Sequence, residues 1–165
     1  MDQPLPVQLG DVAVDLITGI KGVITGRRVH QYDCIHLGME LTELTETKTL
    51  PDIIWLDEQR VQTVEPGKIP AKSPAQHQVT LGAKVKDTIT GFSGQASQIW
   101  TGLNGRVAIC VDPCKLHENQ PVPSYWIDVE RIELIKADKP PVSPQSVAPR
   151  GAMVGETREL QTRGL

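Results

Sequence analysis

The stretch LGDVAVDLITG at residues 9–19 decides the fold, because it returns 72 positions later as LGAKVKDTITG at residues 81–91. The Leu-Gly start, one aspartate and the closing Ile-Thr-Gly are kept in both copies. A second match follows at an offset of 71, where WLDEQRV at residues 55–61 returns as WIDVERI at residues 126–132. Two separated motifs in the same order and nearly the same register indicate an internal duplication.

Each copy predicts about five short strands, the number that a small, strongly bent barrel needs. Apolar and polar residues alternate at residues 11–16 and 84–86 as in a half-buried strand, although the phase differs between the copies. A Thr-Gly-x-x-Gly turn follows, in which glycine tolerates positive φ. The next strand of each copy is expected to begin at residue 23 or 95. The later strands are expected at 34–39 and 106–111, at 53–56 and 125–127, and at 60–64 and 131–135, with a turn or a single 3₁₀ turn at 57–59 and 128–130.

Two kinds of known protein resemble parts of this sequence. The stretch LGDVAV at residues 9–14, followed by Thr18-Gly19 and by KGVI at residues 21–24, resembles the opening of SH3-like and KOW-type barrels. Both copies resemble small proteins encoded in tailed-bacteriophage genomes, through the Thr-Gly-Phe-Ser-Gly turn at residues 90–94 and the Trp-Leu-Asp-Glu element at residues 55–58. The resemblance implies a phage origin and an SH3-like module, and it brings no catalytic residues with it.

We therefore expect an all-β protein of two tandem small SH3-like barrels, joined by a Pro-rich linker and followed by an extended C-terminal arm. The expected segments are an N-terminal extension at 1–8, the first barrel at 9–65, the linker at 66–80, the second barrel at 81–136 and the arm at 137–165. Repeated prolines favour extended, polyproline-like backbone in the linker and in the first part of the arm. Residues 154–162 have the composition of a short helix.

Composition and charge narrow the functional classes. The chain of 165 residues carries a formal charge of −3. Five Lys/Arg against ten Asp/Glu give residues 9–65 a charge of −5, and six against six give residues 81–136 a charge of 0. Neither copy offers the basic groove that phosphate contacts need, so we expect no nucleic-acid partner. We also expect no membrane partner, no export and a reducing compartment, because no apolar run could span a bilayer, the N-terminus carries no export signal and the three cysteines fit no disulfide framework.

One pattern suggests a metal site. Cys110, Cys114 and His117 form Cys-x₃-Cys-x₂-His, but zinc requires four tetrahedral ligands and the first copy supplies no matching set. We therefore interpret Cys110 as a strand residue and the other two as loop residues. The four histidines lie in dissimilar settings without a nucleophile–base pair, and the glycine pairs lack the Lys-Ser/Thr that phosphate binding requires. We expect no enzyme, no catalytic residue, no cofactor and no bound metal.

The three tryptophans fall into a repeated pair and a single residue. Trp55 and Trp126 recur at equivalent positions, and we interpret them as core residues in preference to a ligand platform, because the cores are otherwise poor in aromatic residues. Trp100 has no aromatic counterpart in the first copy, and we interpret it as an interface anchor. The Asp-x-x-Arg spacing at residues 57–60 and 128–131 predicts a local ion pair or turn cap in each copy.

These observations favour a binding or assembly protein. We expect a structural protein of the phage virion, a capsid decoration or a head–tail neck component, made in the host cytoplasm and attached to the major capsid or neck protein. The candidate partner-binding residues are Trp100 on the barrel and Pro140, Pro141, Pro144, Val147, Pro149 and Leu160 on the arm. Self-association of copies stays open. The alternative function is an intracellular phage regulator or anti-defence protein whose barrels bind a host protein, a nucleotide signal or nucleic acid.

Overall fold

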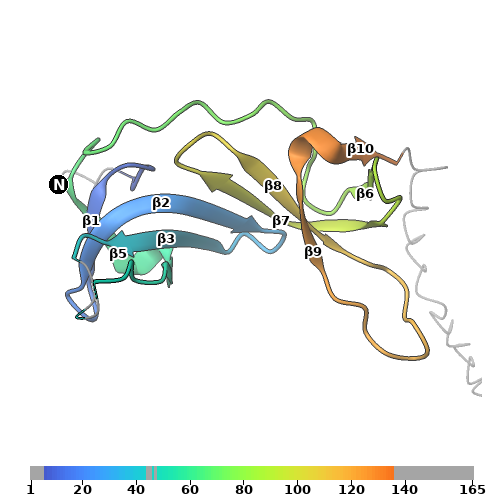
Figure 1. Ribbon diagram of the computed structural model, residues 1–165, viewed down its shortest axis with the longest axis horizontal. Coiled ribbons are helices and arrows are strands. Elements are labelled where there is room, and N and C mark those ends of the chain that lie inside the picture. Colours follow the sequence, from blue (N-terminus) through green and yellow to red (C-terminus); the bar gives the residue numbers. More distant parts are fainter. Residues whose placement is uncertain (1–5, 44–45, 47, 136–165) are drawn as a thin grey trace, which may run out of the picture.

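A computed structural model describes residues 6–43, 46 and 48–135 (Figure 1). These residues are all-β and contain no helix longer than a 3₁₀ turn, so the expected class is confirmed. The first half holds β1 (Val12–Asp15), β2 (Lys21–His30), β3 (Ile35–Leu41), β4 (Ile54–Asp57), η1 (Glu58–Arg60) and β5 (Val61–Glu65). The second half holds β6 (Lys84–Asp87), β7 (Ser93–Gly102), β8 (Val107–Asp112), β9 (Tyr125–Asp128), η2 (Val129–Arg131) and β10 (Ile132–Leu134). Every predicted strand lies within two residues of an observed one, and of the two alternatives for the predicted turns both copies adopt the 3₁₀ turn, one residue later than expected.

Both halves use the same order of strand pairing, and every pair is antiparallel. In the first half β1 pairs with β2 and β5, β2 pairs with β3, and β3 pairs with β4. In the second half β6 pairs with β7 and β10, β7 pairs with β8, and β8 pairs with β9. Equivalent strands therefore find equivalent partners, and the structure repeats as the sequence does.

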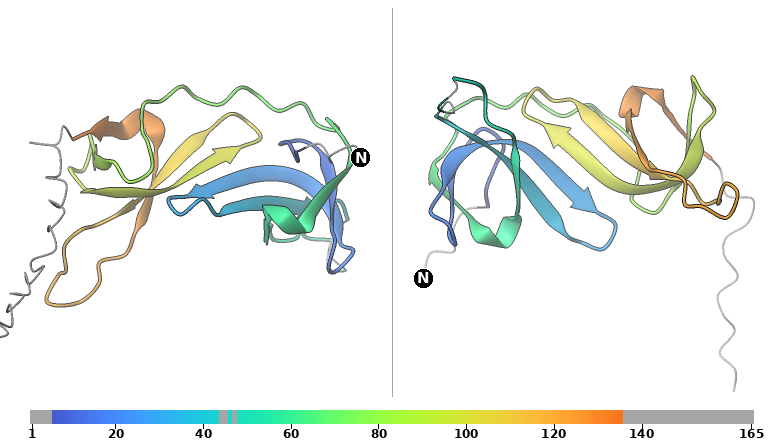
Figure 2. Two further views of the ribbon diagram at one scale, coloured as in Figure 1. Left: turned by 180° about the vertical axis from the view of Figure 1, so that it is seen from behind. Right: turned by 60° about the horizontal axis from the view of Figure 1, so that its bottom comes forward.

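One strand from each half joins the two sets of strands into a single open sheet. β2 pairs with β7, from Gly26 opposite Gly102 to His30 opposite Gln98. At the centre Arg28 lies opposite Trp100, and these two positions are also equivalent in the repeat, 72 residues apart. The junction therefore lies on a pseudo-twofold axis, to which each half contributes the same strand edge. Figures 1 and 2 show β2 and β7 running alongside each other through the middle of the molecule.

Each half buries a core of its own on one side of the sheet. Leu37 and Ile24 are among the most buried residues of the first core, and Ile109 and Val85 hold the same rank in the second. Leu37 and Ile109 are equivalent positions of the repeat, so the two cores are built alike. The described residues form no core shared by the halves, which are joined instead by the β2–β7 ladder, the side chains that cover it and the hydrogen bonds of the connecting segment.

The facing of β1 differs from its hydrophobic pattern. Ala13 and Asp15 point inward and are buried, whereas Leu16 is 59% exposed. The equivalent pair on β6, Val85 and Asp87, is buried in the same way. Alternation of apolar residues would turn Asp15 outward in the first copy, whereas in the second copy it places Asp87 on the same inward face as Val85, as observed.

Long-range ion pairs explain the buried aspartates. Asp15 accepts hydrogen bonds from Nε (3.1 Å) and Nη2 (2.7 Å) of Arg60 and from the Thr18 hydroxyl (2.6 Å). Arg131 binds Asp87 in the same two-pronged way, at 3.0 and 2.6 Å. The arginine and the threonine hold the pKa of each aspartate well below its ordinary value. The predicted pairing of each arginine with the aspartate three residues earlier, or a turn cap by that aspartate, was wrong. The 3₁₀ turn carries the guanidinium to the first strand of its half, where Nε and Nη2 each donate to one carboxylate.

Residues 66–80 contain no strand, but backbone hydrogen bonds hold them to both halves. The N–H of Ile69 donates to Gly10 of the first half (3.0 Å), and the N–H of Ala75 donates to Gly105 of the second (2.9 Å). Figure 1 shows this green segment arching over the sheet on its way from β5 to β6. The connection therefore follows a fixed path along the molecule.

Candidate binding face at the junction of the repeats

Strand alternation turns the two repeated tryptophans away from the cores. Leu56 on β4 and Ile127 on β9 point into the two cores. Successive residues of a strand face opposite sides, so Trp55 and Trp126 lie on the other face of the sheet. Neither belongs to a core cluster, and Trp126 is 42% exposed. The interpretation of these tryptophans as core residues was therefore wrong.

Arg28 lies between these two tryptophans. Its guanidinium carbon is 3.5 Å from the centroid of the Trp55 ring and 5.4 Å from that of Trp126, so it takes part in cation–π contacts with both copies. Burial lowers the pKa of Arg28 from its ordinary value, but a guanidinium stays charged at neutral pH. Its Nε atom is buried and has no hydrogen-bond partner among the residues that the structure describes. The pseudo-twofold axis thus brings the equivalent tryptophans of both halves to one cation.

Trp100 lies beside this cluster, over backbone that carries no side chain. A Cβ atom at Gly26 would come within 2.9 Å of Nε1 of Trp100 and 3.1 Å of Cη2 of Trp55, so glycine lets both rings lie close to the sheet. A groove of about 470 Å³ runs along these two rings. Its lining also includes Ile53, Ile69, Pro70 and Leu103, with Glu40 and Lys72 as charged members. Apolar walls with one charge of each sign suit an extended peptide with small apolar residues.

The structure brings only one of the predicted contact residues into this face. Trp100 is half-buried at the centre of the junction, opposite Arg28. The predicted arm contacts, Pro140, Pro141, Pro144, Val147, Pro149 and Leu160, lie outside the described residues, as does the short helix expected at 154–162. Sequence reasoning missed Arg28. Its only signal was its position, since the alignment of the copies sets it against Trp100.

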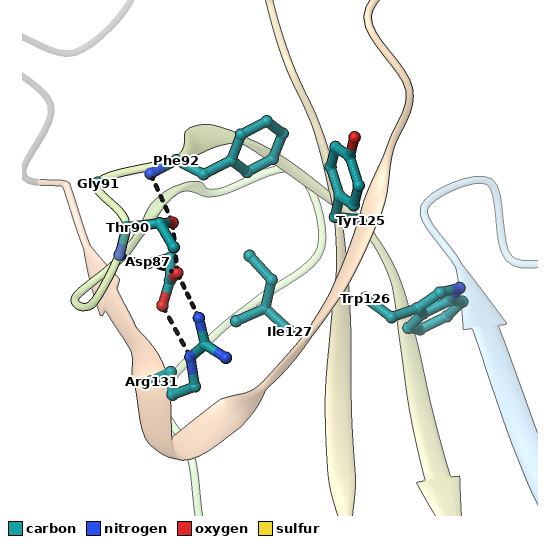
Figure 3. Close-up of a pocket in the computed structure, with 8 residues that line it drawn as sticks. All are labelled: Asp87, Thr90, Gly91, Phe92, Tyr125, Trp126, Ile127 and Arg131. Carbon is teal, nitrogen blue, oxygen red and sulfur yellow. Dashed lines mark hydrogen bonds and ion pairs between the residues drawn. The ribbon is translucent and has the colours of Figure 1, made fainter.

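A second concave site is lined only by residues of the second half (Figure 3). It has a volume of about 540 Å³, and the Asp87–Arg131 ion pair forms one of its walls. Phe92 and Tyr125 meet edge to face across it, with ring centroids 5.2 Å apart. Figure 3 shows Trp126 pointing away from these rings, towards the first half. Trp126 also lines this pocket, so the pocket shares it with the junction face, by which we mean Trp55, Trp126, Arg28 and Trp100.

The cysteine and histidine residues group differently from the sequence pattern. Cys110 is buried in β8, while Cys114 and His117 are exposed, and the described residues form no metal-ligand group from these three. Three other described residues, Cys34, His36 and Asp57, do form a group of possible metal ligands at the end of the β2–β3 hairpin. All three cysteines are free. No helix within the described part of the chain is long and apolar enough to cross a membrane.

The junction face has the chemistry of a binding surface. Flat indole rings and a stacked guanidinium accept proline-rich, apolar or aromatic segments, and the cation adds affinity for carboxylates. In comparisons with known proteins no family model matches the chain, and neither a curated protein nor a solved structure matches it.

Proposed function

We propose that this chain is a non-enzymatic assembly protein that binds its partner through the junction face. The observation that carries the proposal is the placement of Trp55 and Trp126. Both copies keep this tryptophan, yet neither ring belongs to a core, and both converge on Arg28. Large aromatic and arginine side chains held at a surface are the residues that contribute most to protein interfaces.

The finer fold assignment is part of the same proposal. We take each half to be an SH3-like barrel, with residues 66–80 as the Pro-rich linker between them. Support comes from the pairing order, in which the first strand of each half contacts both the second and the last, and from the 3₁₀ turn that precedes the last strand. Domain boundaries at 9–65 and 81–136 follow from the repeat.

The proposed setting is the virion of a tailed phage, on the capsid or at the neck. The Thr-Gly-Phe-Ser-Gly turn at residues 90–94 and its resemblance to phage proteins support this setting. The Pro-rich residues 137–165 would fasten the chain to the major capsid or neck protein, or to another copy of this chain. Proline-rich segments enter aromatic grooves at little entropic cost, because their backbone is already extended.

The test is quantitative mass spectrometry of particles from a phage that encodes the chain. A fixed stoichiometry to the major capsid or neck protein is expected. Trp100→Ala, which removes a groove ring, and Gly26→Ala, which displaces two rings by contact, should both lower incorporation. Tyr32→Ala is the matched control, because this ring is 84% exposed on a turn outside the face. Absence of the wild-type chain from particles that do contain the other structural proteins would refute the virion setting.

The second candidate function is an intracellular regulator, and the pocket of the second half favours it. Phe92 and Tyr125 offer stacking surfaces, and the Asp87–Arg131 ion pair offers polar atoms beside them. Deletion of the residues after Lys136 separates the two functions. An assembly protein fastened by these residues should lose attachment to particles, whereas the pocket lined by Phe92 and Tyr125, which lies within the described residues, should keep its affinity for a ligand.

A further inference from the structure

Four side chains that could bind a metal meet at the end of the β2–β3 hairpin. β2 ends at His30, and the N–H of His30 donates to the carbonyl of Cys34 across the turn (2.9 Å). His36 follows Cys34 by two residues, so the two side chains share a face of the strand. On the next strand Asp57 lies directly opposite His36. Strand register thus brings Asp57, which is remote in sequence, beside the three residues of the hairpin end on one face.

The distances fit one small cation. Nε2 of His36 is 3.6 Å from Sγ of Cys34 and 2.9 Å from Oδ1 of Asp57, and all three ligand atoms lie within 4.8 Å of one another. Zinc bonds of about 2.0–2.3 Å in a tetrahedron place ligand atoms about 3.3–3.6 Å apart. Two of the three separations therefore need adjustments of a few tenths of an ångström at most. The third needs a rotation of exposed side chains, because Cys34 is exposed and the Asp57 side chain is 58% exposed.

His30 holds the imidazole of His36 in the orientation that such a site requires. Nε2 of His30 lies 3.0 Å from Nδ1 of His36, with the two rings edge to face. If Nδ1 of His36 carries the proton and donates it to His30, Nε2 presents its lone pair to Cys34 and Asp57. Histidine ligands of zinc are commonly fixed by a hydrogen bond from the second ring nitrogen. His30 is therefore a positioning residue.

The second half supplies an internal comparison. Asp128 is the equivalent of Asp57, and Arg106 stands at the position equivalent to Cys34. There Arg106 donates to Asp128 at 2.6 Å, so a protein cation neutralises the carboxylate. In the first half a thiol and an imidazole stand in place of that cation. The same backbone thus pairs Asp128 with a guanidinium and surrounds Asp57 with two ligands of a soft divalent ion.

We propose that Cys34, His36 and Asp57 form a binding site for one zinc-class divalent ion, with His30 positioning His36. Thiolate and imidazole ligands in a tetrahedral setting favour zinc over magnesium or calcium. Water completes the coordination, because the site lies at an exposed hairpin end. Binding releases the thiol proton of Cys34, while the proton of neutral His36 moves to Nδ1. The proposal does not rest on the partner proposed for the junction face, although His36 lies opposite Arg28 in the register of β2 and β3.

The test is titration of the metal-free full chain with zinc, using equilibrium competition with a chromophoric chelator, followed by cobalt substitution. One ion per chain should bind, and cobalt should give a thiolate charge-transfer band. Cys34→Ser should abolish that band, whereas Cys114→Ser, the matched exposed-cysteine control, should keep it. His36→Gln should remove binding at concentrations that saturate the wild type, and His30→Gln should weaken it about 10- to 100-fold.

Two outcomes would overturn the proposal. The first is a wild-type chain that shows neither saturable zinc binding nor a cobalt charge-transfer band. The second is binding that survives Cys34→Ser and His36→Gln but is lost in Cys114→Ser. Thermal unfolding of each variant in the presence of chelator separates loss of the site from loss of the fold, and equal melting temperatures are expected because the hairpin end lies outside both cores.

Discussion

The single sheet predicts that the two halves unfold together, and a matched pair of core substitutions tests this. Ile109→Ala and Leu37→Ala change equivalent positions, both almost fully buried, one in each core. Each substitution removes three carbon atoms, which at about 0.8 kcal/mol per carbon is about 2.4 kcal/mol of lost burial. The unfilled cavity adds to this, so we expect each variant to lose about 3 kcal/mol of unfolding free energy. For a chain of this size that corresponds to a melting temperature lower by about 6–12 °C.

The assay is urea denaturation followed in parallel by far-ultraviolet circular dichroism and by tryptophan fluorescence. Trp55, Trp100 and Trp126 all lie at or beside the junction of the two halves. Tryptophan fluorescence therefore reports on the junction, while circular dichroism reports on the strands of both halves. With either core weakened, both signals should move together in one transition. Leu116→Ala, at a side chain that is 66% exposed, should stay within about 0.5 kcal/mol of the wild type.

The refuting result is a split transition. If either variant gave two steps, one at the wild-type midpoint and one lower, the β2–β7 ladder would not couple the halves. A change in tryptophan fluorescence at lower urea concentration than the main change in circular dichroism would show that the junction of the two halves opens first. In that case the junction face could not act as a rigid binding surface, and the proposed function would lose its main support.

Two further predictions concern titratable groups. The pKa values of Asp15 and Asp87 are depressed by their arginine and threonine partners, so the unfolded chain binds more protons at low pH, and stability is full above about pH 4 and falls below it. Asp15→Asn and Asp87→Asn should flatten the decline of the urea midpoint on acidification, and a decline as steep as in the wild type would contradict the ion-pair argument. Burial raises the pKa of the Cys110 thiol, so an aromatic disulfide reagent should titrate Cys34 and Cys114 quickly and Cys110 only in denaturant; three fast thiols would be the contrary result.

Strand positions could be predicted from the sequence because they depend on local features. The Thr-Gly-x-x-Gly turns and the alternating residues on both sides of them mark strand ends, and the duplication lets each copy check the other. Which side chains of each strand point into the core was harder to predict. Asp15 is buried because Arg60, 45 residues away, reaches its carboxylate, and no local pattern contains that information.

The pairing of β2 with β7 could not be predicted, because neither copy carries a sequence pattern that marks this strand edge as the one that pairs with its equivalent. Any exposed strand edge offers unpaired N–H and C=O groups, and the choice of β2 and β7 depends on shape across the whole module. The tryptophans illustrate the consequence. Trp55 followed by Leu56 suits either facing, and only the register of β3 against β4 decides which of the two enters the core. The ligand group around His36 was missed for the same reason.

The difference between Arg28 and Trp100 argues that the junction face arose after duplication. A twofold dimer of identical modules would place the same residue at both positions on the axis, giving two arginines or two tryptophans face to face. Two guanidiniums at directly paired positions of neighbouring strands would repel each other, and two indoles there would leave Trp55 and Trp126 without a cation. In a single chain the two positions diverge independently, so one copy supplies the cation and the other supplies the ring that extends the groove. The two halves together thus form one asymmetric surface, which a symmetric pair of identical halves could not provide.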